Sequence, residues 1–592
     1  MVEQLIREEE AVREGLEPLV AAEIDNFERQ AKAFLAGEGL GDDFRPFRLQ
    51  HGIYGQRQDN VQMIRVKIPH GSLTADQMDV LGEIAERFTP RKVGHVTTRQ
   101  DVQFHFVLLE DVPEVLRIMA RAGLTTREAC GNTVRNVTAD HMSGVCPDTV
   151  FDVTPHAEAT ARFFLRNPVC QKLPRKFKIA FSACPHDHGM VPIHDLGATA
   201  VLRDGRRGFL VVVGGGLGAA PQIAQALDEF VPEQELLRVI EATLRVFDRL
   251  GERKNRNKAR IKFLMKRIGI EELRRLVQEE LTTLPPADSG LYGEPDWSLL
   301  EEEASHPSAA SLGLNGRRPQ PGFAAWKRTN AVPQAQPGFS MAYVLLPIGD
   351  LTVEQFYALA EMSRKYAGGK TRTANNQNMV LRWVHEEDLP SLHADLVDAG
   401  LAEDGALTLT DVMTCPGADT CSLGVTSSKG LGQAIRDHFF STNGHLKDDP
   451  LIEQIRIKIS GCPNSCGHHH VADIGFYGNA VRSGERMVPA FSMLIAGKGD
   501  GPDARIGQHV MKIAAKRVPE AISALIEYYR AGRNEGEPFG DWALRMGLGY
   551  VKEALAEYKE MPAFEQDPMA FVDWGANKLF SLEDMGEGEC SV

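Results

Sequence analysis

Cysteine is scarce in this sequence, with nine residues in 592. This low content argues against a disulfide-stapled secreted protein, because such chains are dense in cysteine. No apolar run approaches the roughly 20 residues that span a bilayer, and the most apolar short stretch is FLVVVGGGLGAA at 209–220. The opening residues MVEQLIREEEAVREGLEPLV also lack an apolar signal segment. We therefore expect a cytoplasmic protein that keeps its thiols reduced.

Positive charge is in deficit as well. The chain has 66 lysines and arginines against 81 acidic residues, a formal net charge of −15, and a pI near 5.7. Nucleic-acid binding needs clustered basic surface, so a dedicated nucleic-acid binder is disfavoured. The length is enough for several domains and for cores that can bury a cofactor.

Four of the cysteines form two pairs, Cys415-x₅-Cys421 in TCPGADTC and Cys462-x₃-Cys466 in GCPNSCG. Four thiolates are what a cubane iron–sulfur cluster requires, and the Gly/Pro-rich turns let backbone N–H groups approach sulfur. Structural zinc also takes four cysteines, but its pairs are usually about two to four residues apart, and the first gap here is five. The pattern favours a [4Fe-4S] cluster over structural zinc and over a disulfide.

The sequence also contains an internal duplication. Residues 62–88 are echoed by residues 341–366, so that Pro347 follows Pro69 by 278 positions (347 less 69). Each copy is typical of a strand, a turn and a helix that opens on a capping box, Thr-x-x-Gln. Each helix leads into one further expected strand. These strands are expected at 95–109 and at 371–384.

The same offset recurs farther along the chain. FSACPHDHG at 181–189 aligns with ISGCPNSCG at 459–467, and Cys462 again follows Cys184 by 278 positions (462 less 184). This period is too long for a small repeat array and predicts a duplicated unit with pseudo-twofold symmetry. His188 stands opposite Cys466, and we expect Cys184, with no near partner in the sequence, to be structural.

Basic side chains concentrate in the first half. Arg65 stands where the second copy has Tyr343, and Lys176 and Lys178 alternate along an expected strand, so that both ammonium groups point to one face. A solvated basic face is the alternative, but the apolar neighbours of these lysines disfavour it. Several cations near a redox centre would bind a small oxyanion and relay protons. The other candidates are Arg99 and Arg135.

Together with the cysteine pattern and the duplication, TTRQDVQFH, VRNV and LPRKFK resemble the siroheme and iron–sulfur nitrite/sulfite reductase family over residues 45–560. The resemblance implies a [4Fe-4S] cluster on the four cysteines, with the sulfur of Cys466 shared with siroheme iron. It implies that Arg65, Arg135, Lys176 and Lys178 meet the substrate anion. Siroheme carries eight carboxylates, which need basic partners. The residues implied for its pocket are Arg99, Gln103, His105, Lys258 and Arg260.

Several residues and motifs allow other interpretations or depart from the family pattern. For His105, a strand histidine satisfied elsewhere is the alternative, and His95 stands where sulfite reductases of the family often carry arginine. The glycine-rich stretch 211–221 fits a dinucleotide motif, but the acidic residue expected after it is missing. A histidine run at 468–470 is expected in a strand, pointing to alternate faces, which disfavours a second metal there.

Tyr54 and Cys130 precede Arg65 and Arg135 in the chain. A phenol and a thiol that approach each other near an oxidising centre could be joined covalently. We state this coupling as a hypothesis, with two buried, unconnected side chains as the alternative.

We expect an α+β protein with a three-domain, pseudo-twofold duplicated architecture, in which ferredoxin-like half-domains accompany two siroheme-facing α+β domains. The expected segments are a mostly helical arm at 1–44, half-domains at 45–115 and 341–400, a siroheme-binding domain with the basic residues at 116–283, a connector at 284–340, a siroheme/[4Fe-4S] domain at 401–560, and an acidic tail at 561–592.

The resemblance implies six-electron reduction at siroheme coupled to the cluster. Lys178 in Lys-x-Lys and His105 favour sulfite, reduced to sulfide, whereas CPNSCG with VADIGF is similar to nitrite reductases, so nitrite reduction to ammonia is the alternative. A non-catalytic iron–sulfur or zinc protein is a more distant alternative, because neither needs an anion pocket. The sequence shows no convincing flavin or nicotinamide domain, so we expect a protein donor, either a ferredoxin or a separate flavoprotein.

Overall fold

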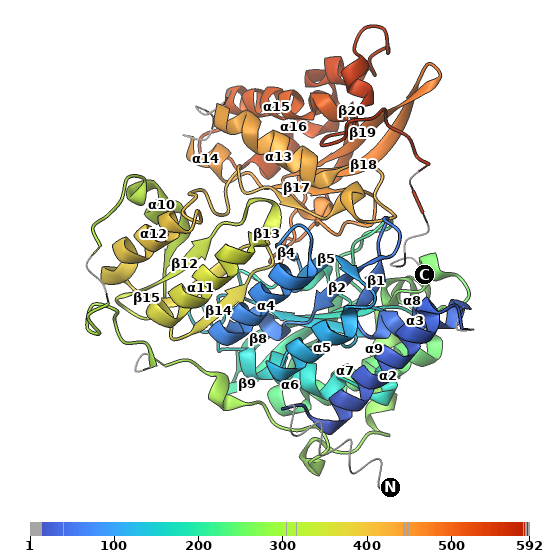
Figure 1. Ribbon diagram of the computed structural model, residues 1–592, viewed down its shortest axis with the longest axis vertical. Coiled ribbons are helices and arrows are strands. Elements are labelled where there is room, and N and C mark those ends of the chain that lie inside the picture. The colour runs from blue at the N-terminus through green and yellow to red at the C-terminus, as the bar shows by residue number, and fades with distance from the viewer. Residues whose placement is uncertain are drawn as a thin grey trace.

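The computed structural model describes residues 15–38, 41–302, 305–314, 317–441, 446, 449–583, 585–586 and 589. Four five-stranded sheets organise this part of the chain. In Figure 1 the two half-domain sheets lie in the middle, the C-terminal sheet lies at the top, and the sheet that holds β8 and β9 lies below. The fold is a duplicated α+β architecture, as predicted.

Each half-domain sheet borrows an edge strand from the other copy. The sheet orders are β1-β2-β5-β4-β13 and β11-β12-β15-β14-β3, so β13 and β3 are the exchanged strands. The first copy comprises β1 (Ile53–Gly55), β2 (Val61–Val66), β3 (Ser72–Thr74), α4 (Ala75–Phe88), β4 (Val93–Val96), β5 (Val102–Leu108) and α5 (Val112–Arg121). The second comprises α10 (Phe323–Asn330), β11 (Ala331–Pro333), β12 (Phe339–Val344), β13 (Asp350–Thr352), α11 (Val353–Tyr366), β14 (Lys370–Thr373), β15 (Met379–His385) and α12 (Leu389–Asp398).

Both predicted capping boxes are present. Thr74 accepts a hydrogen bond from the backbone of Gln77 and the Gln77 side chain accepts one from Thr74, and Thr352 and Gln355 repeat this arrangement. The buried faces of α4 and α11 belong to one hydrophobic core shared by the two half-domains. A Cβ on Gly82 would lie 3.0 Å from the Tyr357 ring, which shows how closely the two helices pack.

The prediction of one strand at 95–109 and one at 371–384 is wrong. Each segment is a hairpin, β4 to β5 and β14 to β15. In the first turn the Thr97 hydroxyl accepts hydrogen bonds from the backbone N–H groups of Arg99 and Asp101, both at 3.2 Å. Gln100 and Gln377 take left-handed φ values of 61° and 69° at matching positions. The threonine turn reverses the chain, so Arg99 lies at a hairpin tip.

The other two sheets share one topology. In each, the first three strands pair in parallel, and the fourth and fifth strands each pair antiparallel to the strand before them. One comprises β6 (Val134–Ala139), β7 (Phe177–Ser182), β8 (Leu196–Arg203), β9 (Arg206–Val213) and β10 (Gln225–Pro232), with α6 (Thr154–Phe164), α7 (Leu236–Leu250), α8 (Ile261–Ile268) and α9 (Ile270–Leu281). The other comprises β16 (Met413–Thr414), β17 (Ile457–Ser460), β18 (Ile474–Ser483), β19 (Arg486–Ile495) and β20 (Gln508–Ala514), with α13 (Ser428–Ser441), α14 (Pro450–Glu453), α15 (Val518–Gly532) and α16 (Phe539–Ala554).

The expected helical arm contains α2 (Pro18–Leu35), while α3 (Gly41–Gln50) runs past its predicted end at residue 44 and residues 1–14 lie outside the described residues. The strand predicted for the histidine run is wrong, because His469–Val471 form a 3-10 turn. Within the described chain, no helix combines the length and apolarity needed to cross a bilayer.

Candidate functional site

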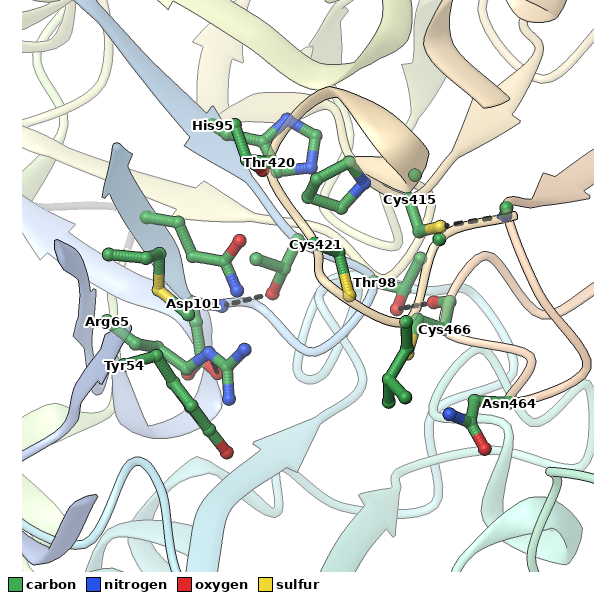
Figure 2. A pocket seen from close by; sticks show the side chains of 18 of the residues that line it. Tyr54, Arg65, His95, Thr98, Asp101, Cys415, Thr420, Cys421, Asn464 and Cys466 are labelled. Carbon is green, nitrogen blue, oxygen red and sulfur yellow. Dashed lines mark hydrogen bonds and ion pairs between the residues drawn. The ribbon is translucent and has the colours of Figure 1, made fainter. Parts of the chain in front are cut away.

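One cavity is lined by residues of the half-domains, of β7 and of the loops after β16 and β17. It encloses about 1340 Å³ of empty space, part of it open to solvent. Figure 2 shows Tyr54, Arg65 and Asp101 on one side and Cys415, Cys421 and Cys466 on the other. The predicted site residues on its wall are Arg65, Arg99, Gln103, His105, Arg135, Lys176, Lys178, Cys415, Cys421, Cys462 and Cys466.

The four cysteines meet because of strand topology. Strands β16 and β17 are parallel neighbours, and the carboxyl ends of parallel strands share one edge of a sheet. Cys415 and Cys421 follow β16, and Cys462 and Cys466 follow β17. A Cβ on Gly467 would lie 1.9 Å from the Ile459 carbonyl oxygen, so only glycine lets this loop turn back on its strand.

The surroundings of the cysteines suit an iron–sulfur cluster. The backbone N–H of Gly461 donates to Cys415 Sγ at 3.2 Å, as the Gly/Pro-rich turns predict. Burial, and then the facing Cys466, raises the pKa of the Cys415 thiol, and burial with Cys466 and Cys415 raises the pKa of Cys462. Four facing thiolates therefore need a cationic partner, and this donor set fits a [4Fe-4S] cluster.

Two arginines on the opposite wall are held in place by backbone carbonyls. Arg135 donates to the carbonyl oxygens of Ala129 at 2.9 Å and Gly131 at 3.0 Å, and Arg65 donates to Ala129 at 3.2 Å. With its amide oxygen turned toward Arg65, Gln103 accepts from Nε at 2.9 Å and Nη2 at 2.7 Å. These contacts orient both guanidinium groups before any anion arrives.

Arg99 and Lys178 are basic side chains whose charge few protein groups balance. Arg99 donates through Nη2 to the Asn136 carbonyl, while its buried Nε and Nη1 find no hydrogen-bond partner within the described chain. Burial lowers the pKa of Arg99 to about 10. Burial, and then Arg99, Arg260 and Lys176, lowers the pKa of Lys178 well below its usual range. Orphaned buried donors of this kind fit the carboxylates of siroheme.

Two residues predicted for the siroheme pocket are absent from the residues that line this cavity. Lys258 is exposed on a 3-10 turn, Arg256–Lys258. Arg260 pairs with the fully buried Asp195, at 2.7 Å between Nη2 and Oδ2. It also donates to the Leu217 carbonyl at 3.4 Å, so it supports the glycine-rich loop from behind.

The glycine-rich stretch connects antiparallel strands β9 and β10, which agrees with the rejection of a dinucleotide motif. Its carbonyls converge on Lys262, whose Nζ donates to Gly216 at 3.2 Å, Leu217 at 2.8 Å and Ala220 at 2.6 Å. His470 lies 3.0 Å from the Gly218 carbonyl oxygen and brings the loop against the C-terminal half. Lys262 therefore holds this loop in shape.

A Lys262→Met variant tests this buried ammonium group. Burial, and then Arg260, lowers the pKa of Lys262 from 10.5 to about 7. The unfolded chain binds the proton more tightly, so wild-type stability rises with pH between about 7 and 10.5 and is lost as pH falls through this window. We expect the variant to lose a slope of at most about 1.4 kcal/mol per pH unit in urea unfolding. The exposed Lys266→Met on the same helix should keep the slope, and equal slopes in all three proteins would contradict this expectation.

Two histidines of the cavity differ in their partners. His95 Nδ1 lies 2.7 Å from Asp350 Oδ1 on the borrowed strand β13, and Lys429 Nζ lies 2.6 Å from the same carboxylate. His95 is therefore tied to the second half-domain. His105 Nδ1 is buried without a hydrogen-bond partner in the described structure, so the alternative of a strand histidine satisfied elsewhere does not hold for this atom.

The sequence analysis missed several cavity residues. Asp101 is buried 3.9 Å from Arg65, and burial raises its pKa. Its position after TTRQ was the available signal. Thr98 donates its hydroxyl to the Cys466 carbonyl at 2.8 Å. Glu589 accepts from the Gly55 N–H at 2.7 Å, a contact between residues 534 positions apart that no local pattern indicates.

The structure also bears on two predictions about cysteines. Tyr54 and Cys130 pack in one small buried cluster, so they are near each other, and their covalent coupling stays a prediction. Cys184, which has no near partner in the sequence, gains two in the fold, since the ligand atoms of Cys146 and His188 lie within 4.8 Å of its sulfur, and its structural role stays a prediction. Tertiary folding brings Cys146 to Cys184 from 38 residues upstream (184 less 146).

Family comparisons agree with this geometry. The nitrite and sulphite reductase 4Fe-4S domain matches residues 130–284 and 405–562, and the nitrite/sulfite reductase ferredoxin-like half domain matches 54–122 and 332–399. The chain belongs to the nitrite and sulfite reductase family. This reductase is thus an oxidoreductase, and its cofactors are siroheme and a [4Fe-4S] cluster, as the sequence predicted.

Individual relatives of the reductase divide by substrate. It is 30% identical to a ferredoxin–nitrite reductase of Synechococcus elongatus, over 78% of this chain and 85% of the relative. It is 28% identical to sulfite reductase [ferredoxin] 1 of Mycolicibacterium paratuberculosis, over 82% of each. The solved structure of the Mycobacterium tuberculosis NirA protein aligns with a TM-score of 0.73 at 26% identity, covering 88% of this chain and 94% of that one. These relatives support the reaction class and leave the anion open.

Proposed function

We propose that this reductase converts sulfite to sulfide with six electrons that a ferredoxin delivers singly through the [4Fe-4S] cluster. The observation that carries the proposal is the number of cations that line the cavity, among them Arg65, Arg135, Lys176 and Lys178. Sulfite in its fully ionised form carries two negative charges on three oxygens, whereas nitrite carries one charge on two. Each further cation in the cavity therefore strengthens the attraction of sulfite more than that of nitrite.

The protein side chains have separable tasks in this reaction. Siroheme, when bound, would supply a redox-active iron for the reduction of the anion, and Arg99 is a buried cation that would pair with its carboxylates. Arg65 and Arg135 are held by backbone carbonyls, so they can orient the oxyanion without reorganising. The depressed pKa of Lys178, caused by burial and neighbouring cations, makes its ammonium group a stronger acid than a solvent-exposed lysine. Lys178 can therefore pass a proton to a departing oxygen more readily than an exposed lysine can.

Nitrite reduction to ammonia is the second candidate. The 30% identity to a cyanobacterial ferredoxin–nitrite reductase favours it, as does the CPNSCG segment noted in the sequence. A ferredoxin donor is supported for either substrate, because relatives of both kinds carry ferredoxin in their names. Delivery by a separate flavoprotein is the alternative for the donor.

Anaerobic turnover with a viologen reductant on both anions tests the substrate. We expect the wild-type kcat/KM to be higher for sulfite than for nitrite. In a Lys178→Asn variant, kcat/KM should fall by about 10² for sulfite and by about tenfold for nitrite, because the dianion loses more attraction with each cation removed.

The control for this comparison is Lys254→Asn, which removes an exposed lysine outside the cavity. It should leave both substrates unaffected. A wild-type enzyme that prefers nitrite would assign the reaction to nitrite instead, and equal losses for the two anions in Lys178→Asn would contradict the charge argument for sulfite.

A further inference from the structure

The first half of the chain holds a second group of metal-ligand side chains, away from the cavity. Cys146 Sγ, Cys184 Sγ and a ring nitrogen of His188 all lie within 4.8 Å of one another. None of the three lines the cavity. Both cysteines are buried and His188 is half-buried. A mixed sulfur and nitrogen set of this kind is typical of zinc sites.

The pseudo-twofold symmetry relates this group to the iron–sulfur cysteines. Ala139 ends β6 and Thr414 ends β16, and each is the last residue paired with the neighbouring parallel strand. Gln100 accepts from the Ala139 N–H at 2.9 Å, and Gln377 accepts from the Thr414 N–H at 2.9 Å, so the two residues occupy equivalent positions. The counterparts of Cys415, Cys421, Cys462 and Cys466 are then Asp140, Cys146, Cys184 and His188.

A second pair of hydrogen bonds confirms the last correspondence. Thr98, at the first hairpin tip, donates to the Cys466 carbonyl oxygen at 2.8 Å. Asn375, at the second hairpin tip, donates to the His188 carbonyl oxygen at 3.0 Å. Each half-domain thus clamps the ligand loop of the opposite half, and the backbone geometry that positions the cluster cysteines also positions His188.

The fourth counterpart is a buried carboxylate. Asp140 is fully buried, and its Oδ1 accepts the Met142 N–H at 2.8 Å. Its Oδ2 lies 3.8 Å from Cys184 Sγ, facing the group. Zinc ligands sit about 2.0–2.3 Å from the ion, so their mutual distances in a tetrahedron are about 3.3–3.8 Å. The Asp140–Cys184 distance matches this value, while Cys146, Cys184 and His188 lie within 4.8 Å of one another and Asp140 stands outside that mutual limit. Binding one ion would therefore draw the four ligand atoms closer together.

The surroundings of this group are more apolar than those of the cysteine-lined cavity. Tyr343 replaces the arginine of the first copy, and its hydroxyl lies 2.6 Å from His141 Nε2. Tyr343 packs with Met142, Val145 and Trp383 in a buried apolar cluster that also includes Cys146 and Cys184. This apolar packing occupies the region that corresponds to the anion wall, so the second site suits an enclosed structural ion.

We propose that Asp140, Cys146, Cys184 and His188 bind one structural Zn²⁺. Binding replaces the two thiol protons, which leave to solvent, by two zinc–sulfur bonds, with no change of oxidation state. Zinc has no redox chemistry here, so it does not compete for the electrons of the iron–sulfur cluster. It joins the loops after β6 and β7 and, through the Asn375 contact, secures them to the second half-domain.

Metal analysis of the purified holoenzyme tests the proposal. We expect one zinc per chain beside the cluster iron by mass spectrometry, and zinc-edge X-ray absorption with two sulfur and two nitrogen or oxygen neighbours. Cys184→Ser and His188→Ala should lower zinc at least tenfold. Cys170→Ala, a buried cysteine outside both ligand groups, should keep it.

A His188→Cys variant keeps the test decisive if the other variants fold poorly, because it should retain zinc and show three sulfur neighbours. The proposal is overturned if zinc-supplemented wild-type enzyme contains less than a tenth of an equivalent, if another metal occupies these ligands, or if bound zinc persists in both Cys184→Ser and His188→Ala. A disulfide between Cys146 and Cys184 in non-reducing peptide maps of wild-type enzyme would also overturn it. None of these readouts depends on which anion is reduced.

Discussion

A Cys466→Ser variant is expected to lose anion reduction almost completely, with kcat at least about a thousandfold lower, equivalent to about 4 kcal/mol. Four cysteines on the cavity wall supply the thiolates of the cluster site. A serine hydroxyl is a poor substitute, because iron in these clusters prefers sulfur ligands. Cys466 is the exposed member of the set, which supports the proposal that its sulfur is the one shared with siroheme. Iron content, acid-labile sulfide and macrocycle absorption should fall together with turnover.

The control for this variant is Cys170→Ser, because Cys170 is a buried cysteine that lies outside the cavity. It should keep iron, colour and turnover. A Cys466→Ser enzyme that retained full iron and near wild-type turnover would remove Cys466 from the cofactor site. Loss of turnover with intact cluster iron and siroheme would restrict its role to the coupling between the two groups.

An Arg135→Gln variant is expected to lower kcat/KM by about 10² to 10³ while cofactor content stays unchanged. Two backbone carbonyls and the Tyr54 hydroxyl, at 3.4 Å, hold the guanidinium against the cavity. A preorganised cation of this kind acts on charge that builds up as oxygen departs, and glutamine cannot supply that charge. Steady-state kinetics with a viologen donor measure the loss.

Two comparisons keep the Arg135 result specific. Tyr54→Phe removes only the longest of the three contacts, so we expect a loss of about tenfold or less. Arg253→Gln replaces an exposed arginine paired with Asp248 and should have no effect. If Arg135→Gln stayed within twofold of wild type, the anion would not depend on this side chain.

Local patterns predicted the parts of the fold that depend on neighbouring residues. Capping boxes, helix faces and a constant offset between copies need only a few adjacent positions, and the structure contains both boxes. The hairpin over 95–109 was missed because strand periodicity runs on through it. Only the hydrogen bonds of Thr97 reveal the turn at Arg99.

The candidate site shows the same division. The cysteine pairs and Lys176 with Lys178 were predictable, because spacing decides which side chains follow one strand or share its face. The buried carboxylate beside Arg65 was not, since Asp101 lies in the turn before the neighbouring strand and meets Arg65 only once β2 and β5 pair. The link from His95 to Asp350 was also hidden, because it spans 255 residues.

By itself, the sequence determined the reaction class and the cofactors of this reductase. Thiolate spacing indicates the iron–sulfur cluster directly, whereas siroheme and the reaction class follow from the resemblance of several motifs to one family, and all of these motifs are visible in a linear chain. The tertiary structure decided which strands the two copies exchange, which cations remain uncompensated, and that Cys146 and His188 lie beside Cys184. These outcomes depend on contacts between residues far apart in the chain, whose energies are set by burial and by the packing of whole elements.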